Sequence, residues 1–341
     1  MKNRGKARGN VKIREMEKPL RTAFTDLVGC HYPIIAGPMF LVSDEQLVSS
    51  VSNAGGVGGM PSLNWRSTEE FRAAVRKVKN LTSQPFAVNL IVNKSNIRAA
   101  ADLKVCAEEG VPIVITSLGS PKDTIKTMHA AGGKVFCDVT TLEYAKKVEA
   151  LGADGVIAVS AGAGGHAGPT SPLVLLPYLR KHISLPIVAA GGIATGEQIA
   201  ACLLLGASAV QIGTRFIACK EAKVDKAYKN AILKAEPDDI VLTEKISGTP
   251  AAVIRTEYIE KQGLHLNPLE QYLMKNGLTK KYTKIARSLW GAYLLKNAAK
   301  TTTWKEVWSA GQGVGLIEDI LPAADIVQRL VKECRAAKVP D

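Results

Sequence analysis

The chain lacks the features that would place it among disulfide-rich, metal-binding or membrane proteins. Its six cysteines form no C-x-x-C pair and show no ligand spacing with the five histidines, so neither a disulfide framework nor a metal site is expected. No apolar run is long enough to cross a bilayer, and the first thirty residues contain no signal-peptide pattern. We therefore expect a cytoplasmic protein with reduced thiols that binds no membrane and no metal.

Positive charge is abundant, at 44 Lys and Arg against 31 Asp and Glu, a formal net charge of +13. Much of the excess lies in residues 2–18 and in the last third of the chain. No aromatic interleaving or recognition motif accompanies it, so nucleic-acid binding is not expected. A basic surface also attracts anionic small molecules, and such a ligand fits the charge better. Residues 1–20 are predicted to be a basic flexible tail.

From Tyr32 onward, short apolar runs alternate with amphipathic segments. Helices are predicted at 43–53, with Ser43 as N-cap and Gln46 at the capping-box position, and near 68–79, capped by Ser67. Further helical patterns cover 141–150 and 195–205. Eight strands with crossover helices predict an α/β fold of the (β/α)₈ TIM-barrel type over residues 21–220. The predicted strands are 33–39, 56–60, 85–92, 113–117, 134–139, 154–159, 186–190 and 209–213.

The strand and helix rhythm stops after Phe216. Residues 221–310 are predicted to form a small helical substrate or lid subdomain over the barrel mouth. In it, 223–233 and 267–296 have helical patterns and 249–256 could be extended. A glycine cluster follows at 310–315. The segment 311–341 is predicted to return to the barrel and to end in an amphipathic helix near 321–337.

A glycine-rich loop, residues 160–168, follows the sixth predicted strand and contains a lone histidine, His166. Ligands sit at the carboxyl ends of parallel strands, where such a loop brings bare backbone close to a flat ligand. An imidazole there can bind an anionic oxygen or transfer a proton near neutral pH. His166 is therefore the candidate catalytic residue. The other histidines have no such setting, and we expect them to have structural roles.

Two further glycine turns end the seventh and eighth predicted strands. Gly191 and Gly192 precede one helix start, and Gly213 and Thr214 follow the next strand. Unblocked N–H groups beside a helix N-terminus favour a dianion, so the pair of turns predicts a phosphate site.

The first and third predicted strands end in residues suited to a planar ring. Gly37, Pro38 and Met39 form a backbone-rich loop, and the carboxamide of Asn89 can donate and accept hydrogen bonds at once. Together with the phosphate site, these residues suggest a phosphorylated planar cofactor such as a flavin. Taken alone, Asn89 could equally be a strand-ending turn residue.

Five spaced motifs together resemble the nitronate monooxygenase family, formerly called 2-nitropropane dioxygenases. The resemblance extends in order from about Thr22 to Ile320, so it covers nearly the whole chain. The motifs are YPII and GPM at 32–35 and 37–39, NAGGVG at 53–58, AGGHAG at 163–168, AAGGIA at 189–194 and QIGTRF at 211–216.

The resemblance implies a TIM barrel that binds FMN non-covalently and oxidises an alkyl nitronate, such as propionate 3-nitronate, with O₂. A homodimer is possible. His166 would be the active-site histidine. The implied FMN-binding residues are Gly37, Pro38 and Met39 along the ring, Asn89 at its polar edge, Gly164 and Gly165 beneath it, and Gly191, Gly192, Gly213 and Thr214 at the phosphate with Gln211 close by.

Some positions depart from the family pattern. At the end of the fifth predicted strand, where some relatives place a lysine near the flavin, this chain has Asp138. A carboxylate would not stabilise an anionic reduced flavin as an ammonium does, so Asp138 either faces elsewhere or changes the redox tuning.

Two other functions stay open. One is an NAD(P)H-dependent flavin reductase of the same superfamily, acting on enoyl-acyl-carrier protein or quinones. The other is a non-catalytic FMN-binding module. An IMP dehydrogenase type of barrel would need a nucleophilic cysteine in a mobile loop, and no cysteine follows that motif.

Overall fold

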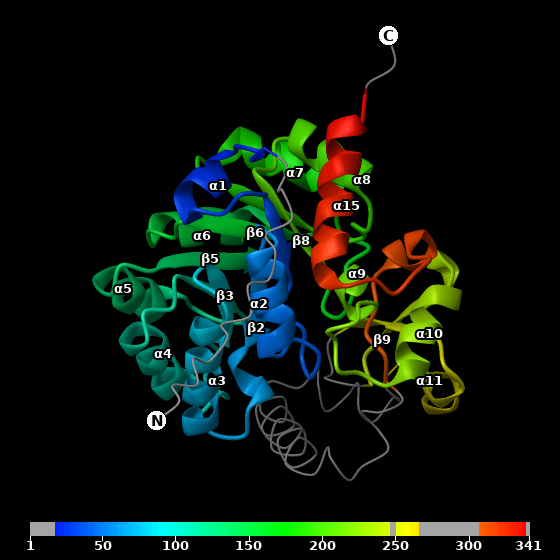
Figure 1. The fold of residues 1–341 in the computed structure, drawn as a ribbon, viewed down its shortest axis with the longest axis horizontal. Helices are drawn as coiled ribbons and strands as arrows, with labels where there is room; N and C mark the ends of the chain where they lie inside the picture. Colours follow the sequence, from blue (N-terminus) through cyan, green and yellow to red (C-terminus); the bar gives the residue numbers. More distant parts are fainter. Residues whose placement is uncertain (1–17, 246–249, 266–306, 339–341) are drawn as a thin grey trace, which may run out of the picture.

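The protein is built around a closed barrel of eight parallel strands, in the computed structural model, which describes residues 18–245, 250–265 and 307–338 (Figure 1). Each strand pairs with the next, and β1 pairs with β8 to close the ring. The predicted TIM barrel is thus confirmed, with strand limits within a few residues of those expected. The strands are β1 Ile34–Ala36, β2 Val57–Pro61, β3 Phe86–Ile91, β4 Ile113–Ser117, β5 Lys134–Val139, β6 Gly155–Val159, β7 Ile187–Ala190 and β8 Ala209–Ile212.

The barrel interior is a packed apolar core. Alternate residues of each strand point inward, and Ile35, Val57 and Phe136 are among those that meet there. Phe24, in the helix that precedes β1, closes the bottom, with its ring 5.4 Å from that of Phe136 in an edge-to-face contact. With the bottom filled, the space for chemistry lies at the opposite end, where the strands terminate.

Helices surround the barrel, and a second, larger apolar core lies between them and the outer faces of the strands. In the sheet, residues such as Val88 and Val135 alternate with the inward set and contact this core. The helices up to β8 are α1 Ala23–Val28, α2 Glu45–Asn53, the short 3₁₀ turn η1 Ser62–Asn64, α3 Thr68–Leu81, α4 Ala99–Glu108, α5 Lys122–Ala130, α6 Leu142–Ala150, α7 Pro172–His182 and α8 Gly196–Leu204.

The N-cap residues show where local sequence was sufficient and where it was not. Ser67, Thr141 and Thr195 each accept a backbone N–H at the start of their helices. The prediction for α2 was wrong by one residue, because Asp44 is the cap. The hydroxyl of Ser43 instead donates to Gly37 O and accepts from the N–H of Met39, which fixes the loop after β1.

The chain after β8 is mixed rather than helical in its described part. It contains an antiparallel two-stranded sheet, which lies with α10 and α11 beside the barrel (Figure 1). The extended stretch predicted at 249–256 corresponds to β10, whereas the helices predicted within 267–296 lie outside the described residues. That 221–310 form a separate lid subdomain stays a prediction. The elements are α9 Thr214–Ile217, α10 Lys226–Lys234, η2 Pro237–Asp239, β9 Ile240–Thr243, β10 Ala251–Ile254 and α11 Glu257–Gln262.

The C-terminal segment returns to the barrel through the 3₁₀ turn η3 Gln312–Leu316 and the helix α15 Ala323–Ala336. Helix α15 packs against both α8 and α2, the last and first crossover helices of the barrel (Figure 1). The approach to α8 is close: a Cβ on Gly196 would lie 2.3 Å from the carbonyl oxygen of Leu330. The N–H of Gly196 also donates to the Glu333 carboxylate at 2.8 Å.

All six cysteines are buried thiols. Burial raises the pKa of Cys30 to about 12, and the pKa values of Cys137, Cys202 and Cys219 to about 11. A thiol with such a pKa is a poor nucleophile at neutral pH. Within the described ranges, no helix combines the length and apolar character needed to span a membrane.

Candidate active site at the barrel mouth

Three polar side chains form part of the floor of the barrel mouth. Asn89, Ser117 and Asp138 come from the consecutive strands β3, β4 and β5. Each lies two positions after a residue of the barrel interior, respectively Ala87, Ile115 and Phe136. Because side chains of a strand alternate, these three polar groups face the same lumen, one layer closer to the mouth.

A chain of hydrogen bonds joins the three residues. Asn89 Nδ2 donates to Ser117 Oγ at 2.7 Å, and Ser117 Oγ donates to Asp138 Oδ2 at 2.5 Å. Asn89 Nδ2 also donates to the carbonyl oxygen of Ile115 at 3.2 Å. That carbonyl can only accept, so the amide nitrogen must be the group that faces it.

The orientation of Asn89 limits what it can offer a ligand. Both N–H groups of its carboxamide are already used within the protein, by Ile115 and Ser117. The expectation that Asn89 would both donate to and accept from a ligand is therefore corrected. Only its oxygen is left for a ligand, as a hydrogen-bond acceptor.

Asp138 combines burial with an incomplete set of partners. Desolvation raises the pKa of its carboxyl from 3.8 to about 6, and the hydrogen bond from Ser117 opposes this shift. Its second oxygen, Oδ1, is buried and has no hydrogen-bond partner among the described residues. A buried polar atom without a partner costs free energy, so a bound group that satisfies Oδ1 would be stabilised.

The opposite side of the mouth is built by β1 and β8. Gly37 donates its N–H to the carbonyl of Ile212 at 2.8 Å, and a Cβ at Gly37 would lie 3.2 Å from Cγ of Gln211. Gln211 lies two residues after Ala209, an interior residue, and its Oε1 is buried and has no partner in the part of the chain that the structure describes. Pro38 packs against Gly59 of β2. The predicted residues Gly37, Pro38 and Gln211 thus lie together.

Among the described residues, nothing requires a glycine at position 213. Of these residues, a Cβ there would meet only the side chain of Met39, with Sδ at 3.7 Å, and the backbone φ of −102° is not in the left-handed region that favours glycine. The space in front of Gly213 is therefore open. Thr214 begins the short helix α9 directly after Gly213, so the start of this helix lies next to the open space.

Other predicted glycines are required by the fold itself. A Cβ on Gly164 would lie 2.8 Å from the carbonyl carbon of Ala310, and one on Gly191 would lie 2.6 Å from Ser160 Oγ. Gly192 has a φ of +69° and a Cβ there would meet nothing closer than 3.9 Å. The turn at Gly191 and Gly192 therefore combines one packing glycine with one that leaves open space.

The C-terminal glycine cluster packs into the mouth. The N–H of Gly311 donates to Thr214 Oγ1 at 3.0 Å, and the N–H of Gln312 donates to the carbonyl of Gly162 at 2.9 Å. A Cβ on Gly313 would lie 2.8 Å from the carbonyl oxygen of Gly192. The loops after β6, β7 and β8 are thus held together by a segment about 100 to 150 residues further along the chain.

His166 lies in the loop after β6, next to the sheet that follows the barrel. Gly165 and Ala252 of β10 exchange two backbone hydrogen bonds, of 3.0 and 2.8 Å, which anchor the loop. The His166 side chain keeps contact with solvent, and its partial burial lowers the pKa of the imidazole. A neutral imidazole near neutral pH can accept or donate a proton.

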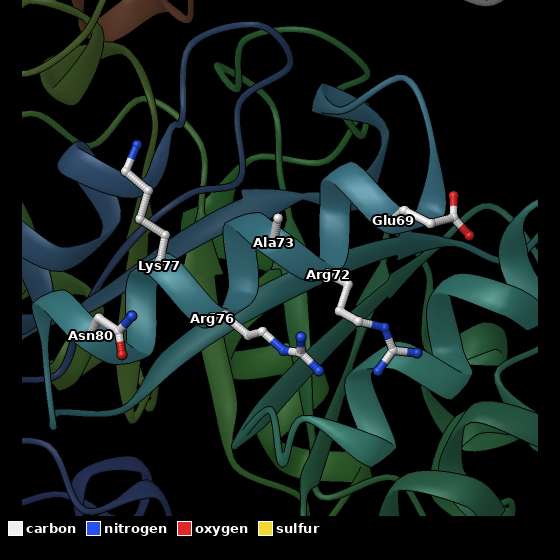
Figure 2. Close-up of a pocket in the computed structure, with 6 residues that line it drawn as sticks. All are labelled: Glu69, Arg72, Ala73, Arg76, Lys77 and Asn80. Atoms are coloured by element: carbon white, nitrogen blue, oxygen red, sulfur yellow. The ribbon is translucent and has the colours of Figure 1, made fainter.

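Features elsewhere on the protein offer fewer groups suited to catalysis or ligand binding than the mouth does. Among the described residues, no group of three or more His, Cys, Asp or Glu could hold a metal ion. A hollow of about 480 Å³ lies on the outer face of α3 (Figure 2). There Arg72 and Arg76 already pair with Glu109 at 2.8 Å. The hollow is lined by Glu69, Arg72, Ala73, Arg76, Lys77 and Asn80.

The closed barrel with polar side chains at the ends of its strands defines a TIM-barrel protein with a candidate active site at its mouth. The sequence model of the family described as "Nitronate monooxygenase" matches residues 21–333. The chain belongs to this family, whose members are flavin-dependent oxidoreductases.

Named relatives differ in activity. The chain is 34% identical to a nitronate monooxygenase of Pseudomonas aeruginosa, over 92% of this chain and 99% of the relative. It is 30% identical to a (3aS,4S,5R,7aS)-5-hydroxy-7a-methyl-1-oxo-octahydro-1H-indene-4-carboxyl-CoA dehydrogenase of Mycobacterium tuberculosis, over 92% and 95% of the two chains. The structure of FabK from Thermotoga maritima superposes with a TM-score of 0.80 at 34% identity, covering 93% of this chain and 97% of that one.

The residues at the mouth fit a flavin. Open space in front of Gly213 and beside Gly192 suits a phosphate at two glycine turns. The unpartnered oxygens of Asp138 and Gln211 offer polar contacts for a ring. Ser117 is the one floor residue that sequence reasoning missed. The alternation of Ile113, Ile115 and Ser117 would have placed its side chain in the lumen.

Proposed function

We propose that the protein oxidises alkyl nitronates, such as propionate 3-nitronate, with O₂ and with FMN as its cofactor. The observation that carries the proposal is the open space in front of Gly213 in a chain that belongs to the nitronate monooxygenase family. No contact among the described residues explains that glycine, whereas a phosphate at the helix start would.

Each predicted cofactor residue has a role in this proposal. The backbone at Gly191, Gly192, Gly213 and Thr214 holds the phosphate, and Gly37, Pro38 and Met39 line the ring. Asn89, Asp138 and Gln211 supply polar atoms, and Gly164 and Gly165 carry the loop beneath the cofactor. When bound, the flavin supplies the redox chemistry, accepting electrons from the substrate and passing them to O₂.

His166 acts on the substrate. Its imidazole, on the loop after β6, binds the oxygens of the anionic nitronate or takes up a proton as the charge of the substrate changes. Partial burial lowers the pKa of this imidazole, which favours its neutral form. The net positive charge of the chain attracts the anion.

Aerobic turnover with two substrates tests the proposal. Purified holoenzyme is given propionate 3-nitronate in one assay and NADH or NADPH in another, and O₂ uptake and nicotinamide oxidation are recorded. Oxygen uptake with the nitronate and no nicotinamide oxidation supports the proposal. The same assays are run on His166→Asn, with His182→Asn as its matched control. His182 ends α7 and contacts Tyr178 there, with ring centroids 4.9 Å apart.

A reductase is the second candidate function. It is favoured by the 30% identity to the carboxyl-CoA dehydrogenase and by the superposition on FabK. Nicotinamide oxidation without nitronate turnover would select it. Flavin binding with neither activity would select a non-catalytic FMN-binding module. We further propose a cytoplasmic location and a homodimer, which fractionation of cells and light scattering would test.

A further inference from the structure

The network of Asn89, Ser117 and Asp138 determines where a proton on Asp138 can lie. The hydroxyl hydrogen of Ser117 lies on the bond to Asp138 Oδ2. Ser117 Oγ in turn accepts from Asn89. With that hydrogen already on Oδ2, a protonated Asp138 carries its proton on Oδ1. This is the buried oxygen that has no partner in the described structure.

The surroundings of Asp138 favour a neutral carboxyl. The neighbouring strands contribute only uncharged side chains to the lumen beside it, Ser117 from β4 and Ile157 and Val159 from β6. Two titratable groups lie near enough to interact with its charge. These are Cys137 on the same strand and Tyr144 on α6, and burial raises the pKa of both.

His166, on the loop after β6, is a further titratable group at the mouth, and its pKa is lowered. The described residues around Asp138 thus provide no cation that would hold it ionised. Its pKa of about 6 reflects desolvation opposed only by the Ser117 hydroxyl.

The mouth therefore presents two complementary polar side chains, one on each side of Ser117. Asn89 has only its oxygen left, an acceptor, because both of its N–H groups are used. A neutral Asp138 adds a donor at Oδ1. A ring edge that alternates donor and acceptor atoms, as the pyrimidine edge of a flavin does, matches this pair.

We propose that Asp138 meets the cofactor as a neutral carboxylic acid that donates a hydrogen bond from Oδ1 to an acceptor atom of the flavin ring, with Ser117 as its positioning residue. This inference rests on the proposed function, since it requires a flavin at the mouth. It assigns a role to the position where the chain departs from the lysine of some relatives. It also explains how a carboxyl group can stand beside a ring that becomes anionic on reduction.

Binding and protonation are then linked. If the flavin binds only the protonated form, its affinity is constant below the apoprotein pKa of Asp138 and falls about tenfold for each pH unit above it. By the same linkage, flavin binding raises the pKa of Asp138. The substitution Asp138→Asn keeps a donor and an acceptor in the same shape but removes the titration.

The test measures affinity and protonation separately. The dissociation constant of apoprotein for riboflavin, which has no phosphate to titrate, is measured by flavin fluorescence between pH 5 and 9, and FMN is measured in parallel. Wild-type protein and Tyr144→Phe, which removes only the titratable hydroxyl of a neighbouring ring, are expected to lose affinity above about pH 6. Asp138→Asn is expected to bind with no such pH dependence.

Infrared difference spectra give a readout independent of the loaded enzyme. Apoprotein should show the C=O stretch of a protonated carboxyl that disappears through the Asp138 titration and is absent in Asp138→Asn. Ser117→Ala should move the disappearance to higher pH, because the Ser117 hydroxyl lowers this pKa, and Ser117→Thr should restore it.

Three results would overturn the inference. They are equal pH slopes in wild type and Asp138→Asn, a carboxyl band that titrates at lower pH once flavin is bound, and no carboxyl band at all. Failure of wild-type protein to bind either flavin at any pH would overturn the proposed function and this inference with it. The first three results leave the proposed function standing.

Discussion

The backbone N–H of Gly311 lies 3.0 Å from Thr214 Oγ1 and donates a hydrogen bond to it, although 97 positions separate the two residues. The contact orients the hydroxyl group at the start of α9, next to the open space in front of Gly213. The C-terminal segment therefore forms part of the wall of the proposed phosphate site, beside the loops that end the barrel strands.

The two glycines Gly213 and Gly164 should respond differently to substitution. We expect Gly213→Val to fold normally but to be purified largely without FMN, since only Met39 lies near its side chain and a ligand would have to fill the same space. Gly164→Ala, in contrast, meets the backbone of Ala310 at 2.8 Å and should lose stability. The ratio of bound flavin to protein and the thermal midpoint are the measurements.

The opposite pattern would contradict the phosphate site. If Gly213→Val bound FMN as tightly as wild type, the glycine would have no role in the site. The assignment of FMN itself would fail if the flavin released by heat had the mass of FAD.

His166→Asn should keep the barrel and the bound flavin but slow the anaerobic reduction of flavin by nitronate. The expected loss is about a hundredfold or more, the range typical of a removed general acid or base. Reoxidation of chemically reduced enzyme by O₂ should change much less, because that half-reaction belongs mainly to the flavin. Stopped-flow absorbance measures both steps.

His182→Asn serves as the matched control and should reduce at the wild-type rate. Wild-type reduction in a folded, flavin-loaded His166→Asn protein would show that the histidine is structural. The glycine loop around it would then serve the cofactor only.

Asp138 should make the apoprotein less stable as pH rises. Its folded pKa, about 6, lies above the ordinary value of 3.8, so ionisation favours the unfolded chain between these values and above. Stability is lost as pH rises through this window. Asp138→Asn should therefore be more stable than wild type at pH 8, by about 3 kcal/mol at most, and by about half as much at pH 5. Urea denaturation of apoprotein at the two pH values measures the difference.

An exposed carboxylate gives the control for this experiment. Asp123→Asn, on the outer surface of α5, should show no comparable change between the two pH values. An unchanged stability of Asp138→Asn at pH 8 would mean that Asp138 ionises in the folded apoprotein as readily as in the unfolded chain.

Thiol and metal chemistry should be dispensable. Each of the six Cys→Ser variants is expected to retain turnover and to lose about 1–3 kcal/mol of stability, because a hydroxyl replaces a buried thiol. A chelator should leave activity unchanged, as the described residues hold no metal-ligand cluster. A Cys→Ser variant that folds, binds flavin and is inactive would show that a thiol takes part in the reaction.

The barrel could be predicted from the sequence because the residue patterns that mark its strands are local. The runs 113–117 and 134–139 are mostly apolar, rich in β-branched residues and preceded by proline or glycine. They match β4 and β5, respectively. The cap of α2 was misassigned because Ser43 and Asp44 are both good caps. The choice depended on Gly37, six residues away from Ser43 and folded against it.

Only part of the floor of the mouth could be predicted from the sequence. The sequence pointed to Asn89 and Asp138 individually but not to their partner Ser117. The hydrogen bonds that occupy the two N–H groups of the Asn89 amide form only when β3, β4 and β5 lie side by side. The support of the His166 loop by Ala252 likewise depends on a contact between distant segments. Such relations are properties of the folded chain and have no local signature.

The packing of α15 on both α2 and α8 has a consequence for how the protein is made. During synthesis, all eight barrel strands leave the ribosome before Gly311 and α15 exist. Until that segment is made, the loops after β6, β7 and β8 lack the backbone contacts it supplies. The surface of α2 and α8 that α15 covers also stays exposed until then. Because long-range contacts form late, the nascent chain should acquire its cofactor only after residues beyond 311 have been translated and docked.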